Sequence, residues 1–540
     1  MKKVISIILT LCIVFGMFSL CAAAEEAPMK VLVTSDIHWR NVGSVSSDGF
    51  FHPRDSLGQM TSLTPLIVER FFADAAASDA DYVFISGDLT DSGSPADSRI
   101  FAGMLADFEA ESGKQVYVID GNHDVDMMDN VPDYSSDHVL FRETYHQFGY
   151  DEALAVDEAT SSYTADLKNG YRLLAVNSNK WNGHGGGAIS DELLAWIETQ
   201  VNAAKKDGKK IVAMMHHHIM DHFPMEQKID DFYILDNYQE ICRKFDEWNI
   251  RVTFTGHLHV SDIAKYEGVN TVYDVTTASL ACYPLTYRAV TFTDRAVKIE
   301  SRAIESLDVA NIVPGYSDEQ KEMIANDPAG YGYGCLGESL IEDYVKNFVS
   351  AEKLIDTLGL EADSLAAKAI KKILPEVLVP LYGEGETVES MAKALGYTLP
   401  ASDYETVGDL ITAFFAAFVR GDEDCGGNSK EGKLFLDAAY ALFATKLANE
   451  SPAVKAVLSS KVASLLGLKG INNIFTRSAL DKILTGIFVD KAPGDNDVTL
   501  RGYERNGSHL WQRIARFLRQ IFEFFRGFFA LDGAKKGPSL

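Results

Sequence analysis

The sequence predicts an α/β domain over residues 25–304, followed by a mostly α-helical region over residues 305–490. Between Met29 and about Arg302, short β-like apolar runs alternate with stretches of helical spacing, which is typical of an α/β domain with largely buried strands. Beyond about Ile304 the helical pattern prevails, with Gly, Pro and Asp as punctuation. The length of 540 residues, too great for one typical domain, agrees with this division.

The β-like runs of the first part are short and rich in Val, Ile, Phe and Tyr. They cover residues 30–35, 81–86, 115–119, 171–177, 210–215, 251–255, 271–277 and 288–292. Apolar side chains at helical spacing lie between them at residues 63–77, 98–111, 191–206 and 238–248. The last runs follow one another without a helix, whereas a parallel connection needs a crossover of a dozen or more residues. We therefore expect part of the sheet to be antiparallel.

Helical patterns of the second part cover residues 338–360, 363–383, 406–421, 433–448 and 451–468. Residues 491–540 are predicted to form a linker and a basic tail, with a linker or short hairpin at 492–507. In the tail, residues 509–530 carry four arginines among many aromatic and aliphatic side chains: Arg513, Arg516, Arg519 and Arg526. Two interpretations stay open: an amphipathic helix that contacts an anionic membrane or cell surface, or a terminal helix packed on the helical region.

The N-terminus has the pattern of a targeting segment. Lys2 and Lys3 precede an apolar core at residues 4–20, and small residues follow before the first acids. This pattern predicts a Sec signal peptide over residues 1–24 and a bacterial protein that is secreted or held at the cell surface. A retained membrane anchor and lipidation at Cys21 are the alternatives.

The later cysteines are widely spaced without a CxxC pair, so they indicate no zinc or redox motif.

The chain is acidic, with a formal net charge of -27 at pH 7. That charge argues against binding to a nucleic-acid scaffold, because phosphate backbones would be repelled. It also means that a site for small phosphate-bearing molecules needs strong local positive charge. Hydrophobic residues make up 46% of the chain, which indicates a folded protein rather than a disordered one.

Polar side chains follow five of the β-like runs, at the point where each run ends. They are Asp36 and His38; Asp88 and Asp91; Asn122, His123 and Asp124; His216, His217 and His218; and His257 and His259. Because ligands bind at the carboxyl ends of strands in an α/β sheet, we expect these groups to converge. Divalent metals take carboxylate oxygen and imidazole nitrogen, and the set is about twice what one ion needs. The sequence therefore favours two ions bridged by a carboxylate, with glycines 87, 121 and 256 allowing close backbone approach.

The order of these blocks resembles a known family. Asp36-x-His38, Gly87-Asp88-x-x-Asp91, Gly121-Asn122-His123-Asp124, His216 and Gly256-His257-x-His259 resemble the motifs of the calcineurin-like metallophosphoesterases. The resemblance extends from residue 29 to about residue 300. It implies that the first domain is a metallophosphoesterase-type αββα sandwich, with two sheets packed between helices.

The resemblance also implies a role for each residue of the set. One metal ion would be bound by Asp36, His38 and His259, and the other by Asn122, His216 and His257, with Asp88 as the bridge. His217 is the alternative to His216, because three histidines follow that strand. His123, Asp88 and Asp124 would serve catalysis, with Asn122 and His123 facing the substrate, and Asp91 and Asp124 would orient His123 or the metal ligands.

The activity that the resemblance implies is hydrolysis of small phosphomonoesters or phosphodiesters. A hydroxide bridging two divalent ions would attack phosphorus, and His123 would protonate the leaving oxygen. Manganese, iron and zinc all suit these ligands. Tyr283 or Arg288 would line the substrate groove. The alternative is a surface-tethered binding protein with a structural metal centre and a partner-binding helical domain, although the presence of His123 favours an enzyme.

Overall fold

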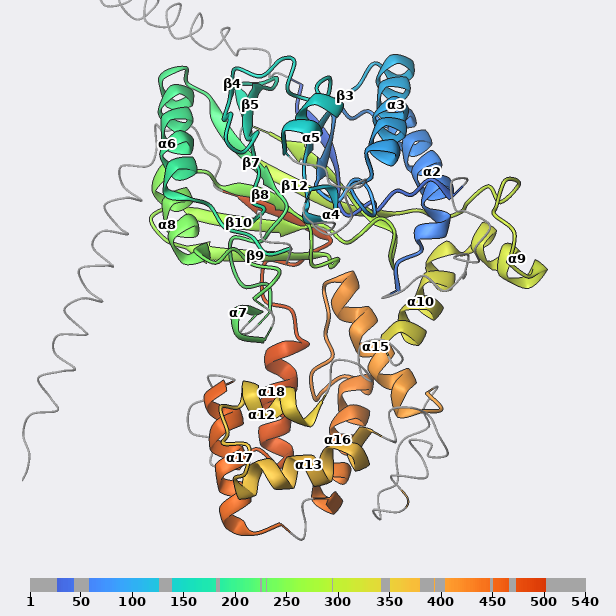
Figure 1. Ribbon diagram of the computed structural model, residues 1–540, viewed down its shortest axis with the longest axis vertical. Coiled ribbons are helices and arrows are strands. Elements are labelled where there is room, and N and C mark those ends of the chain that lie inside the picture. The colour runs from blue at the N-terminus through green and yellow to red at the C-terminus, as the bar shows by residue number, and fades with distance from the viewer. Residues whose placement is uncertain are drawn as a thin grey trace, which may run out of the picture.

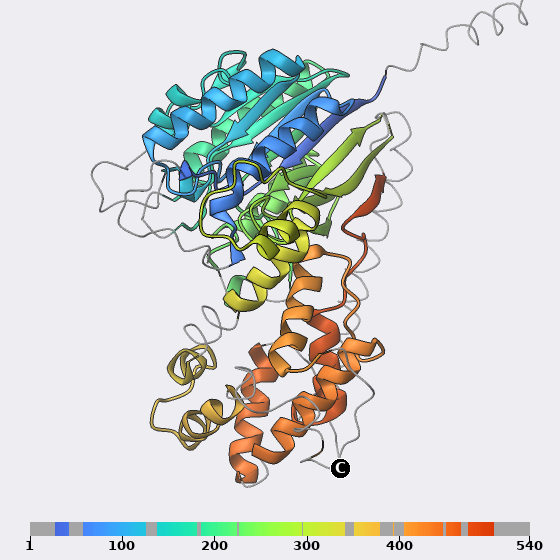
Figure 2. The same ribbon diagram turned by 90° about the vertical axis from the view of Figure 1, so that its right-hand side faces the viewer.

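The α/β part of the molecule contains two sheets packed face to face, with the helical part beside it (Figures 1 and 2). The computed structural model describes residues 27–42, 58–125, 138–180, 185–223, 226–229, 231–293, 295–340, 350–378, 393, 404–446, 450–465 and 473–501. The predicted signal peptide and the basic tail beyond residue 501 lie outside the described residues.

The first sheet has six strands in the order β13-β12-β11-β1-β2-β3. These strands are β1 (Met29–Thr34), β2 (Tyr82–Ser86), β3 (Gln115–Ile119), β11 (Thr286–Phe292), β12 (Ala296–Ala303) and β13 (Asp497–Arg501). β1, β2 and β3 are parallel, whereas β11, β12 and β13 continue the sheet in antiparallel pairs. The expectation of a partly antiparallel sheet is therefore confirmed.

The second sheet has seven strands in the order β4-β5-β6-β7-β8-β10-β9. They are β4 (Ala155–Val156), β5 (Tyr163–Asp166), β6 (Tyr171–Val176), β7 (Lys210–Met215), β8 (Val252–Thr255), β9 (Asp262–Glu267) and β10 (Thr271–Thr276). β6, β7, β8 and β10 form its parallel centre. The carboxyl ends of β7 and β8 consequently lie at the same edge of the sheet.

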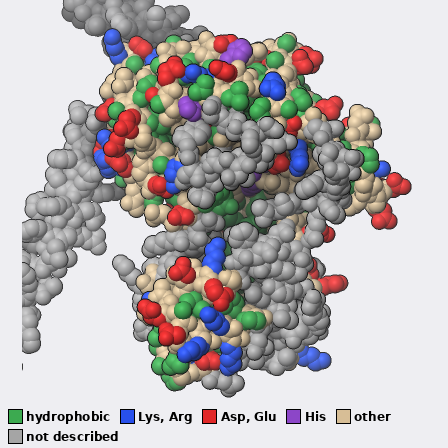
Figure 3. Space-filling model, viewed as in Figure 1, with side chains coloured by type: hydrophobic (Ala, Val, Ile, Leu, Met, Phe, Trp, Pro, Cys, Tyr) green, Lys and Arg blue, Asp and Glu red, His purple; other side chains and the backbone are tan. Residues whose placement is uncertain are grey.

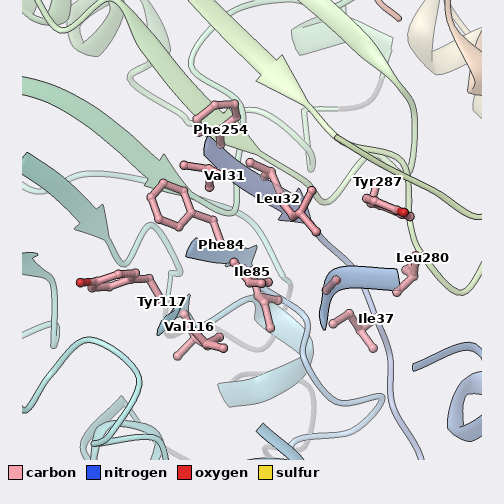
Figure 4. Packing of buried hydrophobic residues seen from close by; sticks show 14 of the residues in the cluster. Val31, Leu32, Ile37, Phe84, Ile85, Val116, Tyr117, Phe254, Leu280 and Tyr287 are labelled. Carbon is pink, nitrogen blue, oxygen red and sulfur yellow. The ribbon is translucent and has the colours of Figure 1, made fainter. Parts of the chain in front are cut away.

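Helices cover the outer face of each sheet, which confirms the αββα arrangement. α2 (Thr64–Ala77), α3 (Pro95–Ser112) and α5 (His138–Thr144) belong with the first sheet, and α6 (Asp191–Lys206) and α8 (Tyr238–Trp248) with the second (Figure 1). Between the sheets, the rings of Phe84 on β2 and Phe254 on β8 lie 6.3 Å apart at their centres (Figure 4). Both rings are fully buried, so apolar burial holds the two sheets together.

The helical part follows β12. Its described helices are α9 (Asp318–Asn326), α10 (Pro328–Ser339), α12 (Ala351–Thr357), α13 (Leu365–Leu378), α15 (Val407–Arg420), α16 (Lys430–Lys446), α17 (Pro452–Leu465) and α18 (Arg477–Ile487). Two small apolar clusters form its interior, one around α13 and α17 and one around α15, α16 and α18. On the face drawn in Figure 3, acidic and basic side chains are interspersed over both parts of the molecule. Among the described residues, no helix combines the length and apolar character needed to span a bilayer.

The segment after the last helix returns to the α/β part, where we had expected only a linker or short hairpin. Asp497–Arg501 forms β13, which pairs with Ala296–Glu300 of β12 and extends the first sheet. Leu500 is buried there, 2% exposed, against the first core cluster. The sequence of this segment alternates too weakly to predict a strand, and only the free edge of β12 gives it a partner.

Several carboxylates meet where the helical part joins the α/β part. Asp495 accepts hydrogen bonds from the backbone N–H groups of Ile263 and Asp422. Asp262, Asp490 and Asp495 each place an oxygen within 4.8 Å of the others. Burial and the neighbouring Asp262 raise the pKa of Asp495 to about 8, and the same two causes raise the pKa of Glu423 to about 8.

We predict that this junction makes the protein less stable at alkaline pH. A carboxyl whose pKa is higher in the folded state stabilises the fold at low pH, and that stabilisation is lost as the pH rises through the folded-state pKa, here about 8. Glu423→Gln removes one such charge. The variant should therefore lose less unfolding free energy than the wild type between pH 6 and pH 9, by on the order of 1 kcal/mol. Denaturant unfolding at both pH values measures this, and equal losses would contradict it.

Candidate metal centre

The loops after β1 and β2 run side by side and place two carboxylates next to each other. The parallel register pairs Thr34 with Ile85, and beyond the strands Asp36 N–H donates to Gly87 O at 3.1 Å. His38 N–H then donates to Asp88 O at 3.0 Å. Because the ladder continues past the strand ends, Asp36 and Asp88 are fixed as neighbours by the backbone.

The second sheet supplies histidines to the same place. Gly256 N–H, after β8, donates to His216 O, after β7, at 3.0 Å. His257 N–H donates to Asp36 Oδ2 at 2.9 Å and so joins the two sheets at their carboxyl ends. The convergence that the sequence predicted is therefore present, and Asp36, His216 and His257 are each less than 5% exposed.

Asp36, His38 and His259 form a first group of ligand atoms. His259 Nε2 lies 3.2 Å from Asp36 Oδ1 and 3.1 Å from His38 Nε2. One atom from each of the three residues lies within 4.8 Å of the other two, a spacing that suits a single metal ion. These are the residues that we expected to bind one metal.

Asp88, His216, His257 and Asn122 form a second group beside the first. His216 Nε2 lies 3.3 Å from Asp88 Oδ2, 3.1 Å from His257 Nδ1 and 3.0 Å from Asn122 Oδ1. Asp88 Oδ2 is also 3.8 Å from His38 Nε2, in the first group. Asp88 thus lies between the two groups, in the place expected for a bridging carboxylate.

Two buried carboxylate oxygens test whether these residues fit metal ions. Asp36 Oδ1 and Asp88 Oδ2 have no hydrogen-bond partner among the described residues. Burial opposes the charge of Asp88, but His216 and His123 hold the pKa of its carboxyl well below the usual range. Burial likewise opposes the charge of Asp36, yet His259 and His216 lower the pKa of its carboxyl. Charged, buried oxygens without a donor are expensive unless a cation binds them, so the residues fit divalent metal ions.

The backbone at these residues is strained. Five of them adopt left-handed φ values between 46° and 68°: Asp36, His38, Asp88, His257 and His259. Such conformations cost roughly 1–3 kcal/mol each for residues with a Cβ, and they cluster at functional sites. Gly87 and Gly121 make room for the ligands, since a Cβ there would lie 2.3 Å from His216 Nδ1 and 2.1 Å from Asp88 Oδ1.

The structure places His216, rather than His217, in the group of ligands. His216 Nδ1–H donates to Ser86 O at 2.9 Å, which leaves Nε2 facing Asp88. Both ring nitrogens of His217 point elsewhere, to Ser178 Oγ at 2.8 Å and to Gly185 O at 2.8 Å. Burial and the charge of His216 lower the pKa of His217 to about 3, so its ring is neutral. The geometry therefore favours the first histidine of the three.

His123 is partly exposed and lies beside His38 and Asp88, with a ligand atom within 4.8 Å of one from each of them. Its ring centre is 4.6 Å from that of His38. Its N–H donates to Asp88 Oδ1 at 2.8 Å, and its ring Nδ1–H donates to the carbonyl oxygen of Asp91 at 2.8 Å. Since Nδ1 is occupied, Nε2 is the atom available to a substrate. The orienting group at position 91 is thus the backbone carbonyl, while the Asp91 carboxylate lies 3.6 Å from Arg40 Nη1.

Asp124 is buried next to the centre, and both of its carboxylate oxygens accept hydrogen bonds. Oδ2 accepts from Leu89 N–H and Gly121 N–H, and Oδ1 accepts from Thr90 N–H and the Thr90 hydroxyl. Four donors fix both oxygens, so contact with a substrate is not part of this arrangement. Asp124 instead ties the loop that carries Asp88 to the loop that carries His123.

Two polar contacts of the centre were not predicted from the sequence. Gln59 Nε2 lies 3.3 Å from His38 Nε2, and Cys282 Sγ lies 3.7 Å from His259 Nδ1. Both residues come from segments without a metal-binding motif, so no local signal marks them.

The prediction that Arg288 lines a groove is wrong: it is fully buried, and its guanidinium donates to the carbonyl oxygens of Asp495 and Thr276.

We predict that replacing the two neighbouring histidines separates metal binding from folding. His216→Ala should lower the number of metal ions bound per chain, because it removes Nε2 from the second group. His217→Ala should leave metal content unchanged and destabilise the fold by about 1–3 kcal/mol, because Gly185 O loses its buried donor. Elemental analysis and denaturant unfolding of both variants measure this. Metal loss in the His217 variant alone would contradict the assignment.

Comparison with known proteins agrees with this geometry. Residues 29–261 match the family model of the calcineurin-like phosphoesterases. A cAMP/cGMP dual specificity phosphodiesterase of Mycobacterium tuberculosis (strain CDC 1551 / Oshkosh) is 26% identical over 276 residues, 49% of this chain and 72% of that protein. A "Probable cyclic nucleotide phosphodiesterase" of Rhodococcus erythropolis (strain PR4 / NBRC 100887) is 26% identical over 212 residues, 39% of this chain and 60% of that protein.

Among solved structures, a dimetal phosphatase of Danio rerio is similar with a TM-score of 0.39 and 11% identity, covering 51% of this chain and 96% of that one. A likeness at this level carries no argument of its own. The family match covers every residue of the two ligand groups. Residues 29–261 are therefore identified as a calcineurin-like phosphoesterase domain, and this match, together with the two phosphodiesterases among the relatives, supports a hydrolase that acts on phosphoric ester bonds.

Proposed function

We propose that the chain is an exported phosphodiesterase that uses two divalent metal ions and hydrolyses small phosphodiesters, cyclic nucleotides among them. The observation that supports it best is the position of Asp88, whose Oδ2 lies 3.3 Å from His216 Nε2 and 3.8 Å from His38 Nε2. One carboxylate thus adjoins both groups of ligands. A shared carboxylate offsets the mutual repulsion of two cations about 4 Å apart.

The chain holds its metal ligands in place before a substrate arrives. His123 N–H fixes one oxygen of Asp88, and His257 N–H fixes one oxygen of Asp36, so each carboxylate presents its other oxygen to the centre. Divalent ions bound here would neutralise charge on a phosphoryl group and lower the pKa of a water molecule, so that hydroxide is available near neutral pH. Ligands fixed in advance need no reorganisation during the reaction, which favours catalysis.

His123 is the group best placed to transfer a proton to the leaving oxygen. Its half-buried ring is held by the bond from Nδ1–H to Asp91 O, which leaves Nε2 as the ring nitrogen for a substrate. A histidine within hydrogen-bond reach of a leaving oxygen can protonate it as the P–O bond breaks. Asp124 supports this step only indirectly, because its four hydrogen bonds hold the loops that carry His123 and Asp88.

The substrate class rests on the two relatives. Both are named as cyclic nucleotide phosphodiesterases, and their sequences are 26% identical to this one over 276 and 212 residues. Manganese, iron and zinc each suit a set of Asp, Asn and His ligands. We therefore propose a cyclic phosphodiester as the preferred substrate and one of these metals as the cofactor.

Export and surface contact are proposed from the sequence. Residues 1–24 have the basic and apolar parts of a Sec signal peptide, and residues 509–530 combine four arginines with many aromatic and aliphatic residues. Both segments lie outside the described residues. The proposal is that the mature protein acts outside the cytoplasm and that its tail contacts an anionic membrane or cell surface.

We predict that Asp88→Asn abolishes most of the activity. The wild type with added Mn²⁺ should hydrolyse 3′,5′-cAMP and bis-p-nitrophenyl phosphate, and the variant should be slower by about 100-fold or more, since several kcal/mol of transition-state stabilisation depend on the metals. Asp151→Asn, which changes an exposed carboxylate paired with His146, is the matched control and should keep the wild-type rate. Wild-type protein that is fully loaded with metal but inactive on both substrates would overturn the proposal, as would an active Asp88 variant.

A further inference from the structure

The two ring nitrogens of His259 face different surroundings. Nε2 points into the centre, 3.2 Å from Asp36 Oδ1 and 3.1 Å from His38 Nε2. If Nε2 is the atom that binds a metal, Nδ1 carries the hydrogen and needs an acceptor. In metal sites this outer acceptor fixes the tautomer and the orientation of the ring.

The other two candidate ligand histidines on the second sheet use backbone carbonyls for this purpose. His216 Nδ1–H donates to Ser86 O at 2.9 Å, and His257 Nε2–H donates to Phe232 O at 3.3 Å. For His259 Nδ1, the partner that the described residues provide is the thiol of Cys282, at 3.7 Å from Nδ1 to Sγ. A thiol sulfur is a weaker acceptor than a carbonyl oxygen. The hydrogen bond from His259 Nδ1–H therefore depends closely on where Cys282 Sγ lies.

Cys282 is held firmly beside the centre. It is 7% exposed, and its backbone forms an antiparallel bridge with Gln59. Met60 N–H donates to Ala281 O at 2.7 Å, and Leu285 N–H donates to Cys282 O at 2.7 Å. Gln59, on the other side of the bridge, contacts His38. The paired segments 58–60 and 281–285 therefore form one support for two of the ligand histidines.

Helix α10 of the helical part packs against this support. Gly58 N–H donates to Ser339 Oγ at 2.7 Å, and a Cβ on Gly58 would lie 3.3 Å from Leu336 Cα. Gly332 of α10 lies against Met60, and a Cβ there would be 3.0 Å from the Met60 Cε atom. Gly58 has a left-handed φ of 76°, which favours glycine, and the contacts at both positions bring the helix and the support close together.

We propose that Cys282 is a positioning residue that orients His259 for metal binding, and that α10 holds Cys282 in place. The inference rests on the proposed metal-dependent function and names what the helical part contributes to it. Loss of an outer partner of this kind typically weakens metal affinity by about 10- to 100-fold. The helical part is then a structural component of the metal centre as well as an extension of the chain.

The test measures Mn²⁺ affinity by calorimetric titration of the metal-free full-length chain. Cys282→Ala removes the acceptor and should weaken one Mn²⁺ site by about 10-fold or more. Cys282→Ser restores an oxygen acceptor, although on a shorter bond, so its affinity should lie between those of the wild type and the Ala variant. Cys425→Ala removes another buried thiol, in the helical part, and should leave Mn²⁺ affinity unchanged.

The order of the two Cys282 variants separates positioning from packing. If Cys282 only filled space, Ala would bind Mn²⁺ at least as well as Ser, because a buried hydroxyl without a partner is costly. That order, or equal affinity in all variants, would overturn the inference while leaving the proposed function intact. A wild type that binds none of Mn²⁺, Fe²⁺ and Zn²⁺ would overturn both.

A separate variant tests whether α10 holds Cys282 in place. Ser339→Ala removes the acceptor of Gly58 N–H at a distance from the ligands. It should weaken Mn²⁺ binding in the same site as Cys282→Ala, by a smaller factor. Unchanged Mn²⁺ affinity in a folded Ser339 variant would contradict the proposal that α10 holds Cys282 in place.

Discussion

The rest of the site depends on two buried carboxylate oxygens, Asp36 Oδ1 and Asp88 Oδ2, which lie near the same histidine, His216. Neither has a hydrogen-bond partner among the described residues, and the backbone at both is left-handed. The parallel pairing of β1 with β2 forces them together, and histidines from the other sheet surround them. Such an arrangement is costly in an isolated fold and becomes favourable when cations bind, which is how a protein of strongly negative charge can attract a phosphate ester.

The α/β part and the helical part of the chain contact each other closely, although their sequence patterns differ. β13 returns from the helical part to complete the edge of the first sheet, and Asp495 caps the N–H of Ile263, four residues after His259. Ser261 N–H donates to Val419 O at the end of α15. On the other side of the centre, α10 supports the segment that carries Cys282. The helical part therefore contacts the segments next to the ligands from two directions.

The sequence predicted those features that depend on short motifs. The alternation of apolar runs predicted an α/β domain, and the polar residues at the strand ends predicted the convergence of Asp36, Asp88 and His216. The αββα sandwich was predicted from the resemblance to the calcineurin-like metallophosphoesterases. Cys282, Gln59 and the strand β13 could not be predicted, because their roles arise from contacts between segments far apart in the chain. Arg288 was misassigned for the same reason: a guanidinium can equally satisfy buried carbonyl oxygens, and only tertiary structure distinguishes that from substrate binding.

Anomalous diffraction from crystals grown with Mn²⁺ is the most direct test of the central claim that Asp88 bridges two metal ions. Two strong peaks about 4 Å apart are expected, with Asp88 Oδ2 between them. One peak should lie beside Asp36, His38 and His259, and the other beside Asn122, His216 and His257. A single peak at full Mn²⁺ occupancy, or peaks that Asp88 does not contact, would contradict it.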